Sequence, residues 1–148
     1  MKSFYFISGL PRSGSTLLSA ILKQNPDFYA DIASPVQGIV TNTIDFMTGC
    51  ESNLNLTESR RKDLILSLFD GYYSFLETPV VFDSSRGWTK NTTLLQELFP
   101  TTKILCCVRD LAWIINSFEL ITIIFNIKNV VFRNNNTIIK VLRNSKSF

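Results

Sequence analysis

Two glycines near the N-terminus have the spacing of a loop that binds phosphate. Gly9 and Gly14 stand as far apart as the two glycines of a Walker A loop, and Thr16 occupies the last place of that pattern. Position 15, where the pattern requires lysine, is serine. Backbone N–H groups that point to one spot beside a helix N-terminus bind an anion even without a lysine. The spacing therefore predicts a phosphate-binding loop.

Polar side chains within the loop add hydrogen-bond donors at the same place. The dipeptides Arg12-Ser13 and Ser15-Thr16 flank the second glycine. An ordinary turn between a strand and a helix is the alternative, because Gly, Pro and Ser are common in such turns. The two donor-bearing pairs, following an apolar strand and preceding a helix, favour the phosphate loop.

A second pair of residues suited to phosphate lies near position 110. Arg109 follows an apolar segment, and Ser117 comes eight residues later in a predicted helix. An arginine at the end of a strand can make two parallel hydrogen bonds to a phosphate, and a serine can supply another donor. Taken singly, Arg109 could instead pair with Asp110 on the surface, and Ser117 could face solvent.

The residue types that are missing limit the chemistry further. The chain has no histidine, which excludes Ser-His-Asp and Cys-His catalysis and metal sites that contain histidine. A general base would have to be a carboxylate, or else a lysine or tyrosine. The three cysteines, Cys50, Cys106 and Cys107, have no C-x-x-C spacing, so we expect no metal and interpret them as small buried apolar residues.

The apolar pattern predicts the elements that position these residues. Strands are predicted at 4–8, 79–83 and 103–108, and helices at 17–24, 36–47, 57–76, 94–99 and from 110 onward. Strands separated by helices indicate an α/β fold with a parallel sheet and helices on both faces. Ligands bind such sheets beyond the carboxyl ends of the strands. The loop, the segment Asp83–Arg86 and Arg109 each follow a predicted strand, which supports a shared site.

The loop resembles a motif of a known family. The run Pro11-Arg12-Ser13-Gly14-Ser15-Thr16-Leu17 is similar to the 5′-phosphosulfate loop of the sulfotransferases, Pro-[Lys/Arg]-Ser-Gly-[Thr/Ser]-[Thr/Ser]. This resemblance implies a three-layer fold of the P-loop type. It also implies that 3′-phosphoadenosine 5′-phosphosulfate (PAPS) is the donor of a sulfuryl group to a hydroxyl or amine. The residues from Pro11 to Leu17 would then hold the phosphosulfate.

The second pair resembles the 3′-phosphate motif of the same family, in which an arginine ends a strand and a serine follows eight residues later. Cys107-Val108-Arg109-Asp110 and Ser117 fit it. The resemblance implies that Arg109 and Ser117 bind the ribose 3′-phosphate. The pair Pro26-Asp27 after the first helix is similar to the bacterial and tyrosylprotein-sulfotransferase types.

The catalytic residues of the family have only approximate counterparts. The tyrosylprotein type has a catalytic glutamate a few residues after Pro-Asp, whereas this chain has Asp31 near that place. Asp31 is the candidate base, with a loop or capping aspartate as the alternative. Arg86 is the candidate for stabilising charge on the transferring group, where the family has a lysine. A surface arginine beside Asp83 is the other interpretation of Arg86.

The resemblance covers about residues 4–119 and not the rest. Residues 120–148 are rich in Ile, Asn and Lys, and no counterpart is found for the later family segment that also binds the 3′-phosphate. We therefore expect residues 1–119 to be the N-terminal part of a sulfotransferase-like domain. Residues 120–148 are expected to be an unassigned tail. The chain would then be either a PAPS-dependent sulfotransferase or a truncated, inactive relative of one, with an incomplete fold.

Composition bounds the partners and the alternatives. A net charge of +3 over 148 residues does not indicate nucleic acid, and polar residues interrupt the apolar segment 111–127, so we expect a cytoplasmic protein that does not enter a membrane. The acceptor would be a small molecule or a peptide, and the oligomeric state is left open. There are two alternatives. One is a P-loop protein similar to nucleotide kinases, against which stands Ser15 at the position where that class needs lysine. The other is a non-catalytic nucleotide-binding protein.

Overall fold

The structure is a computed structural model that describes residues 2–49 and 56–131, and side chains only as far as residue 124. It consists of two compact units, Met1–Val108 and Arg109–Phe148, which are described separately.

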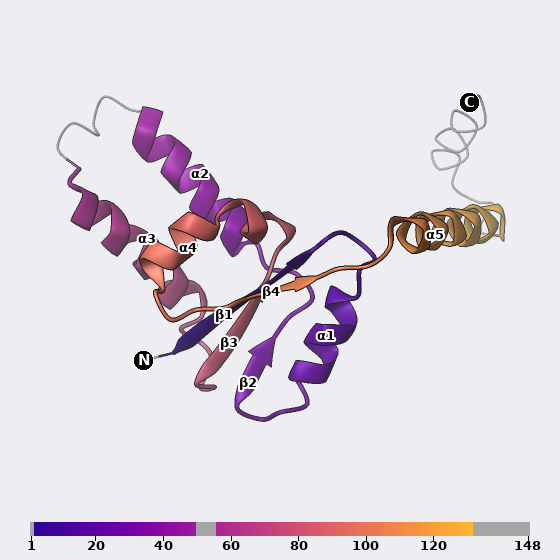
Figure 1. Cartoon of the computed structure of the whole chain (residues 1–148), viewed down its shortest axis with the longest axis horizontal. Coiled ribbons are helices and arrows are strands. Elements are labelled where there is room, and N and C mark those ends of the chain that lie inside the picture. The colour runs from indigo at the N-terminus through magenta and orange to yellow at the C-terminus, as the bar shows by residue number, and fades with distance from the viewer. Residues whose placement is uncertain (1, 50–55, 132–148) are drawn as a thin grey trace. The chain divides into compact units, whose positions relative to one another are not determined.

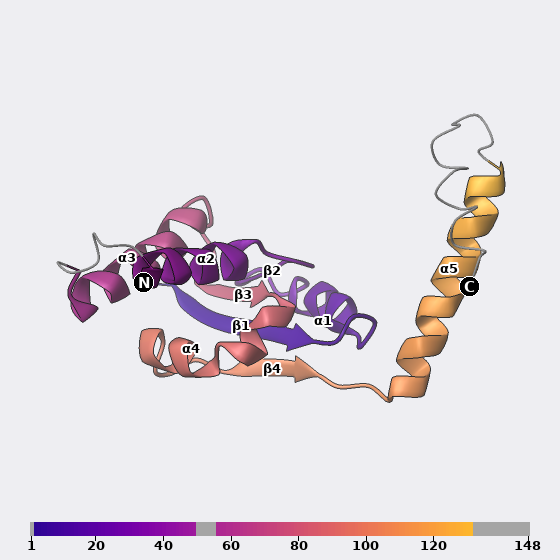
Figure 2. The same cartoon turned by 90° about the horizontal axis from the view of Figure 1, so that it is seen from above.

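The first unit is built on a parallel sheet. Its described strands are β1 (Ser3–Gly9), β2 (Phe28–Ala30), β3 (Val80–Ser84) and β4 (Ile104–Cys107), in the spatial order β2-β3-β1-β4. Every pairing in the sheet is parallel, so the carboxyl ends of the strands reach the same edge. Figure 2 shows β1, β3 and β4 running in the same direction.

Helices cover both faces of this sheet (Figure 1). They are α1 (Ser15–Leu22), α2 (Val36–Gly49), α3 (Glu58–Tyr72), the short 3₁₀ helix η2 (Arg86–Lys90) and α4 (Thr92–Leu98). The predicted α/β class, with a parallel sheet between two helical layers, is confirmed.

The two faces of the sheet carry separate apolar clusters. On one face, alternate side chains of β1 and β3 pack with α2, α3, η2 and α4, and Phe6, Phe69 and Trp88 are fully buried among them. On the other face, Ile7 and Phe82 pack with Leu18 and Leu22 of α1. Because successive side chains of a strand point to opposite faces, the central strand β1 contributes to both clusters. This double burial explains its nearly continuous apolar sequence.

Local sequence signals set most of the helix boundaries. The Thr57 hydroxyl accepts a hydrogen bond from the backbone N–H of Arg60 at 3.4 Å and caps α3, close to the predicted start of this helix. Pro35 directly precedes α2, and Pro100 follows shortly after α4. Each of these residues suits a helix end, because proline fixes φ and lacks an N–H group.

The strand β4 differs from its prediction. It was expected to be buried, with two small apolar cysteines, yet Cys106 is exposed and Cys107 is only partly buried. The reason is topological, since β4 pairs with β1 and forms an edge of the sheet within the described residues. Leu105 is also exposed. Cys50 lies outside the described residues.

The second unit contains one described element, α5 (Leu111–Val131). Asp110 caps its first turn, because Asp110 Oδ1 accepts a hydrogen bond from the backbone N–H of Ala112 at 2.8 Å. The helix continues through residue 119, where the sequence pattern placed a boundary, and residues 132–148 lie outside the described part. No described helix combines the length and the apolar character that crossing a membrane requires.

Candidate functional site

The loop between β1 and α1 is curled by residues with positive φ. Arg12 has φ 66°, Gly14 has φ 111°, and Gly9, at the end of β1, has φ 144°. The backbone N–H of Ser13 donates to the carbonyl oxygen of Leu10 at 3.2 Å and closes a tight turn. This conformation folds the loop back over the end of the strand.

Gly9 is required by the close packing at the start of the loop. A Cβ atom at this position would lie 2.5 Å from the carbonyl oxygen of Cys107 and 2.8 Å from the Ser13 hydroxyl oxygen. A side chain would therefore push β4 and the loop apart. The first glycine of the motif thus serves packing, and its role is structural.

The second glycine leaves an open space in front of a helix. Gly14 is the N-cap of α1, where the described residues supply no side-chain cap, and no atom lies within 4 Å of the position that a Cβ would take. The first N–H groups of an α-helix lack partners within the helix, and they stand at the positive end of its dipole. An anion can fill this place.

Ser13 contributes an unusual hydroxyl group. Its Oγ is buried and has no hydrogen-bond partner among the described residues. A buried polar atom without a partner costs about 1–3 kcal/mol, so such atoms in a native protein require an explanation. A ligand in the loop would supply the missing partner.

The side chains of the predicted loop differ in their exposure. Arg12, Thr16 and Leu17 are exposed, whereas Pro11, Ser13 and Ser15 are half-buried. The loop therefore exposes the Arg12 guanidinium and the Thr16 hydroxyl, while its serine side chains are partly buried.

The segment after β3 is fastened to the end of β1 beside this loop. The backbone N–H of Ser85 donates to the carbonyl oxygen of Ile7 at 3.0 Å, and the Ser8 hydroxyl donates to the carbonyl oxygen of Arg86 at 3.0 Å. The side chain of Arg86 is exposed. The structure thus brings the backbone of Arg86 and the loop to the same edge of the sheet, as predicted for parallel strands.

The predicted residues of the second unit lie along one side of α5. The Arg109 guanidinium stands over the Trp113 ring, 5.7 Å from its centroid. A groove of about 410 Å³ runs along this side, and Arg109, Trp113, Asn116 and Ser117 are among the residues that line it. Helical spacing accounts for this arrangement, because residues four apart are neighbours on a helix.

A sequence model of the sulfotransferase family matches residues 5–133. The chain belongs to the sulfotransferase family. The match covers most of the chain and extends beyond residue 119. A comparison with curated proteins found no match.

The candidate base Asp31 follows β2, at the edge of the sheet. Its carboxylate accepts hydrogen bonds from the Tyr29 hydroxyl at 3.1 Å and from the backbone N–H of Ile32 at 2.9 Å. Burial and the negative charge of Asp31 raise the pKa of Tyr29 to about 12. One strand, β3, separates β2 from β1. Asp31 is exposed and shares the carboxyl edge of the sheet with the loop, but it follows a different strand.

Asp83 is buried in the core of the first unit. It is 1% exposed and accepts three hydrogen bonds, from the Tyr73 hydroxyl at 2.6 Å, the Trp88 indole N–H at 2.8 Å and the Ser34 hydroxyl at 2.9 Å. Burial raises the pKa of its carboxyl group, and the three hydrogen bonds oppose this effect. Asp83 follows β3, where a kinase-like protein would need a metal-binding carboxylate, but here its oxygens accept hydrogen bonds from protein donors. The described residues contain no cluster of three or more potential metal ligands.

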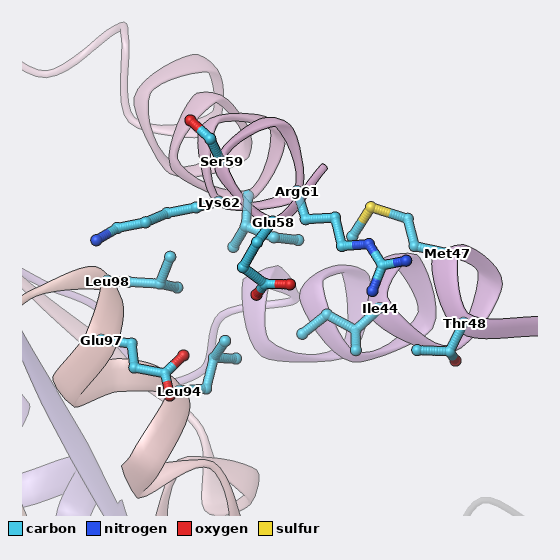
Figure 3. Close-up of a pocket in the computed structure, with 11 residues that line it drawn as sticks. Ile44, Met47, Thr48, Glu58, Ser59, Arg61, Lys62, Leu94, Glu97 and Leu98 are labelled. Atoms are coloured by element: carbon cyan, nitrogen blue, oxygen red, sulfur yellow. The ribbon is translucent and has the colours of Figure 1, made fainter. Parts of the chain in front are cut away.

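A separate pocket lies away from the loop (Figure 3). It has a volume of about 540 Å³ and is bounded by α2, α3 and α4. Apolar side chains, including Ile44, Met47 and Leu98, meet charged ones from the start of α3. None of the predicted site residues lines it.

Proposed function

We propose that this sulfotransferase transfers a sulfuryl group from PAPS to a hydroxyl or amine group of a small molecule or peptide. The observation that carries this proposal is the β1–α1 loop. It combines a helix N-terminus without a side-chain cap, the open space at Gly14 and the buried, unpartnered hydroxyl of Ser13. These features suit the phosphosulfate end of the donor.

The loop would hold the donor through backbone and side-chain groups together. We assign the 5′-phosphosulfate to the segment from Pro11 to Leu17, with N–H groups of the first turn of α1 directed at its oxygens. Arg12 would add a charge-assisted hydrogen bond, which is about twice as strong as a neutral one. The hydroxyls of Ser13, Ser15 and Thr16 would complete the donor set. Arg109 and Ser117 would hold the 3′-phosphate.

The sulfuryl group supplies the electrophile, and the protein mainly positions it and stabilises charge, as in phosphoryl transfer. We assign Arg86 to negative charge on the transferring group, since its backbone is held beside the loop by Ser8. Asp31 is the proposed base that accepts the proton of the acceptor. It is exposed and therefore accessible to an acceptor. This scheme uses no metal ion.

Thermal unfolding tests the proposal in three samples: protein with 3′,5′-ADP, protein with ATP and Mg²⁺, and protein without ligand. A ligand at 100 times its Kd stabilises the folded state by about 2.7 kcal/mol. We expect 3′,5′-ADP to raise the melting temperature without any metal. Stabilisation by ATP with Mg²⁺ alone would instead support the kinase-like alternative. The absence of stabilisation by either ligand would support a protein that does not bind these nucleotides.

A further inference from the structure

We infer that Trp113 is a positioning residue for Arg109, and that its indole ring makes the site selective for a ligand with a ribose 3′-phosphate. This inference rests on the proposed function. It concerns a residue to which neither of the two motifs assigns a role.

Trp113 lies between the two residues that are proposed to bind the 3′-phosphate. Arg109 precedes it by four residues and Ser117 follows it by four, and all three line the same groove. The guanidinium carbon of Arg109 is 5.7 Å from the centre of the indole, within the range of a cation–π interaction. Trp113 is 61% exposed, so the ring is accessible rather than committed to a core.

A guanidinium can contact an aromatic ring and also make two parallel hydrogen bonds to a phosphate. The N–H groups of a guanidinium lie in its plane, so a ring that contacts its flat face does not compete with them for a phosphate. Arginine has a long, flexible side chain and loses rotamer entropy when it binds a ligand. An aromatic ring that already holds the side chain reduces this loss, which favours binding through preorganisation.

The composition of the groove makes the orientation of Arg109 important. Among the described residues that line the groove, Arg109 is the one cation, and Glu119 adds a negative charge. A 3′-phosphate in the groove would therefore depend on this single guanidinium for charge compensation. A ligand without that phosphate would gain nothing from the stacked arrangement.

Calorimetric titration with 3′,5′-ADP and 5′-AMP tests the inference on five proteins: wild type, Trp113→Leu, Trp113→Phe, Arg109→Ala and the double variant Arg109→Ala/Trp113→Leu. We expect Trp113→Leu to weaken binding of 3′,5′-ADP by about two- to fivefold, the range of an exposed cation–π contact, and to leave 5′-AMP unaffected. Trp113→Phe should retain most of the affinity, because it keeps an aromatic face. In the Arg109→Ala background, Trp113→Leu should have no further effect.

A matched control separates this role from a general effect on the helix. Ile115 lies on the same helix, is 56% exposed and does not line the groove, so Ile115→Ala should leave both affinities unchanged. Equal losses for both ligands in Trp113→Leu, or a full further loss in the Arg109→Ala background, would overturn the inference. If wild type binds 3′,5′-ADP more tightly than 5′-AMP and Trp113→Leu shows the same preference, the role of Trp113 alone is overturned. A wild-type protein that binds both ligands equally would overturn the proposed function and this role with it.

Discussion

Substitution of Gly9 by alanine should destabilise the protein more than substitution of any other described glycine in the loop. The new Cβ would lie 2.5 Å from the carbonyl oxygen of Cys107, and that oxygen belongs to the backbone of β4 and cannot rotate away. Overpacking of this kind costs about 1–3 kcal/mol. The φ of 144° at Gly9 adds strain for an L-residue of about 1–3 kcal/mol. Together these effects predict a loss of about 2–6 kcal/mol in the free energy of unfolding.

Two other glycines provide matched controls. Gly14→Ala meets no atom within 4 Å and should cost only the strain of its left-handed backbone, about 1–2 kcal/mol. Gly38 lies in α2, and its Cβ would also meet open space, so Gly38→Ala should stabilise the protein by about 0.4–1 kcal/mol.

Equilibrium unfolding in urea, followed by circular dichroism, measures all three free energies. The expected order of stability is Gly38→Ala, wild type, Gly14→Ala and Gly9→Ala. If Gly9→Ala were as stable as Gly14→Ala, the close approach of β4 to the loop would be wrong. If Gly38→Ala were as damaging as either of them, the differences could not be attributed to local contacts.

Three further results are expected. Arg12→Ala should weaken calorimetric binding of 3′,5′-ADP by about tenfold or more, because it removes a charge-assisted contact of about 1.5–3 kcal/mol; an unchanged affinity would remove Arg12 from the site. Ser13→Ala should leave the melting temperature of the ligand-free protein unchanged or raise it, since the Ser13 Oγ has no partner among the described residues. The same substitution should weaken the binding of 3′,5′-ADP. An unchanged affinity would mean that the hydroxyl does not contact the ligand. Burial raises the pKa of Asp83 above its ordinary value of 3.8, so the folded state holds this proton more tightly than the unfolded state. The free energy of unfolding of wild type, relative to that of Asp83→Asn, should therefore be greatest below pH 3.8 and fall as the pH rises above it. Urea unfolding of both proteins at a series of pH values measures this difference. A difference that does not change with pH would contradict the prediction.

The sequence predicted the loop and the long elements because their signals are local. Apolar runs marked β1, β3 and β4, and Thr57 and Asp110 marked the helix starts that their side chains cap. The strand β2 was not predicted, because it has only three residues and follows a run of exposed ones.

Other features depend on contacts between distant residues, which spacing does not reveal. One interpretation of the sequence places Asp83 beside a surface Arg86, but its hydrogen-bond donors come from Ser34, Tyr73 and Trp88. Two of these residues precede it in the chain, by 49 and 10 positions. The exposure of β4 also follows from the strand order, which the sequence pattern alone did not determine.

The buried carboxylate of Asp83 has a consequence for the motions of this protein. Its donors belong to three separate segments, one just after Asp31 and another in the helix that begins with Arg86. Opening either segment would leave a buried acceptor with an unmet hydrogen bond, at a cost of about 1–3 kcal/mol. Both segments should therefore open only in rare fluctuations that also disturb the core. In a hydrogen-exchange experiment, the indole N–H of Trp88 should exchange as slowly as the amides of the central strand. If Asp31 and Arg86 act as proposed, the sulfuryl acceptor would have to enter and leave past backbone that stays closed.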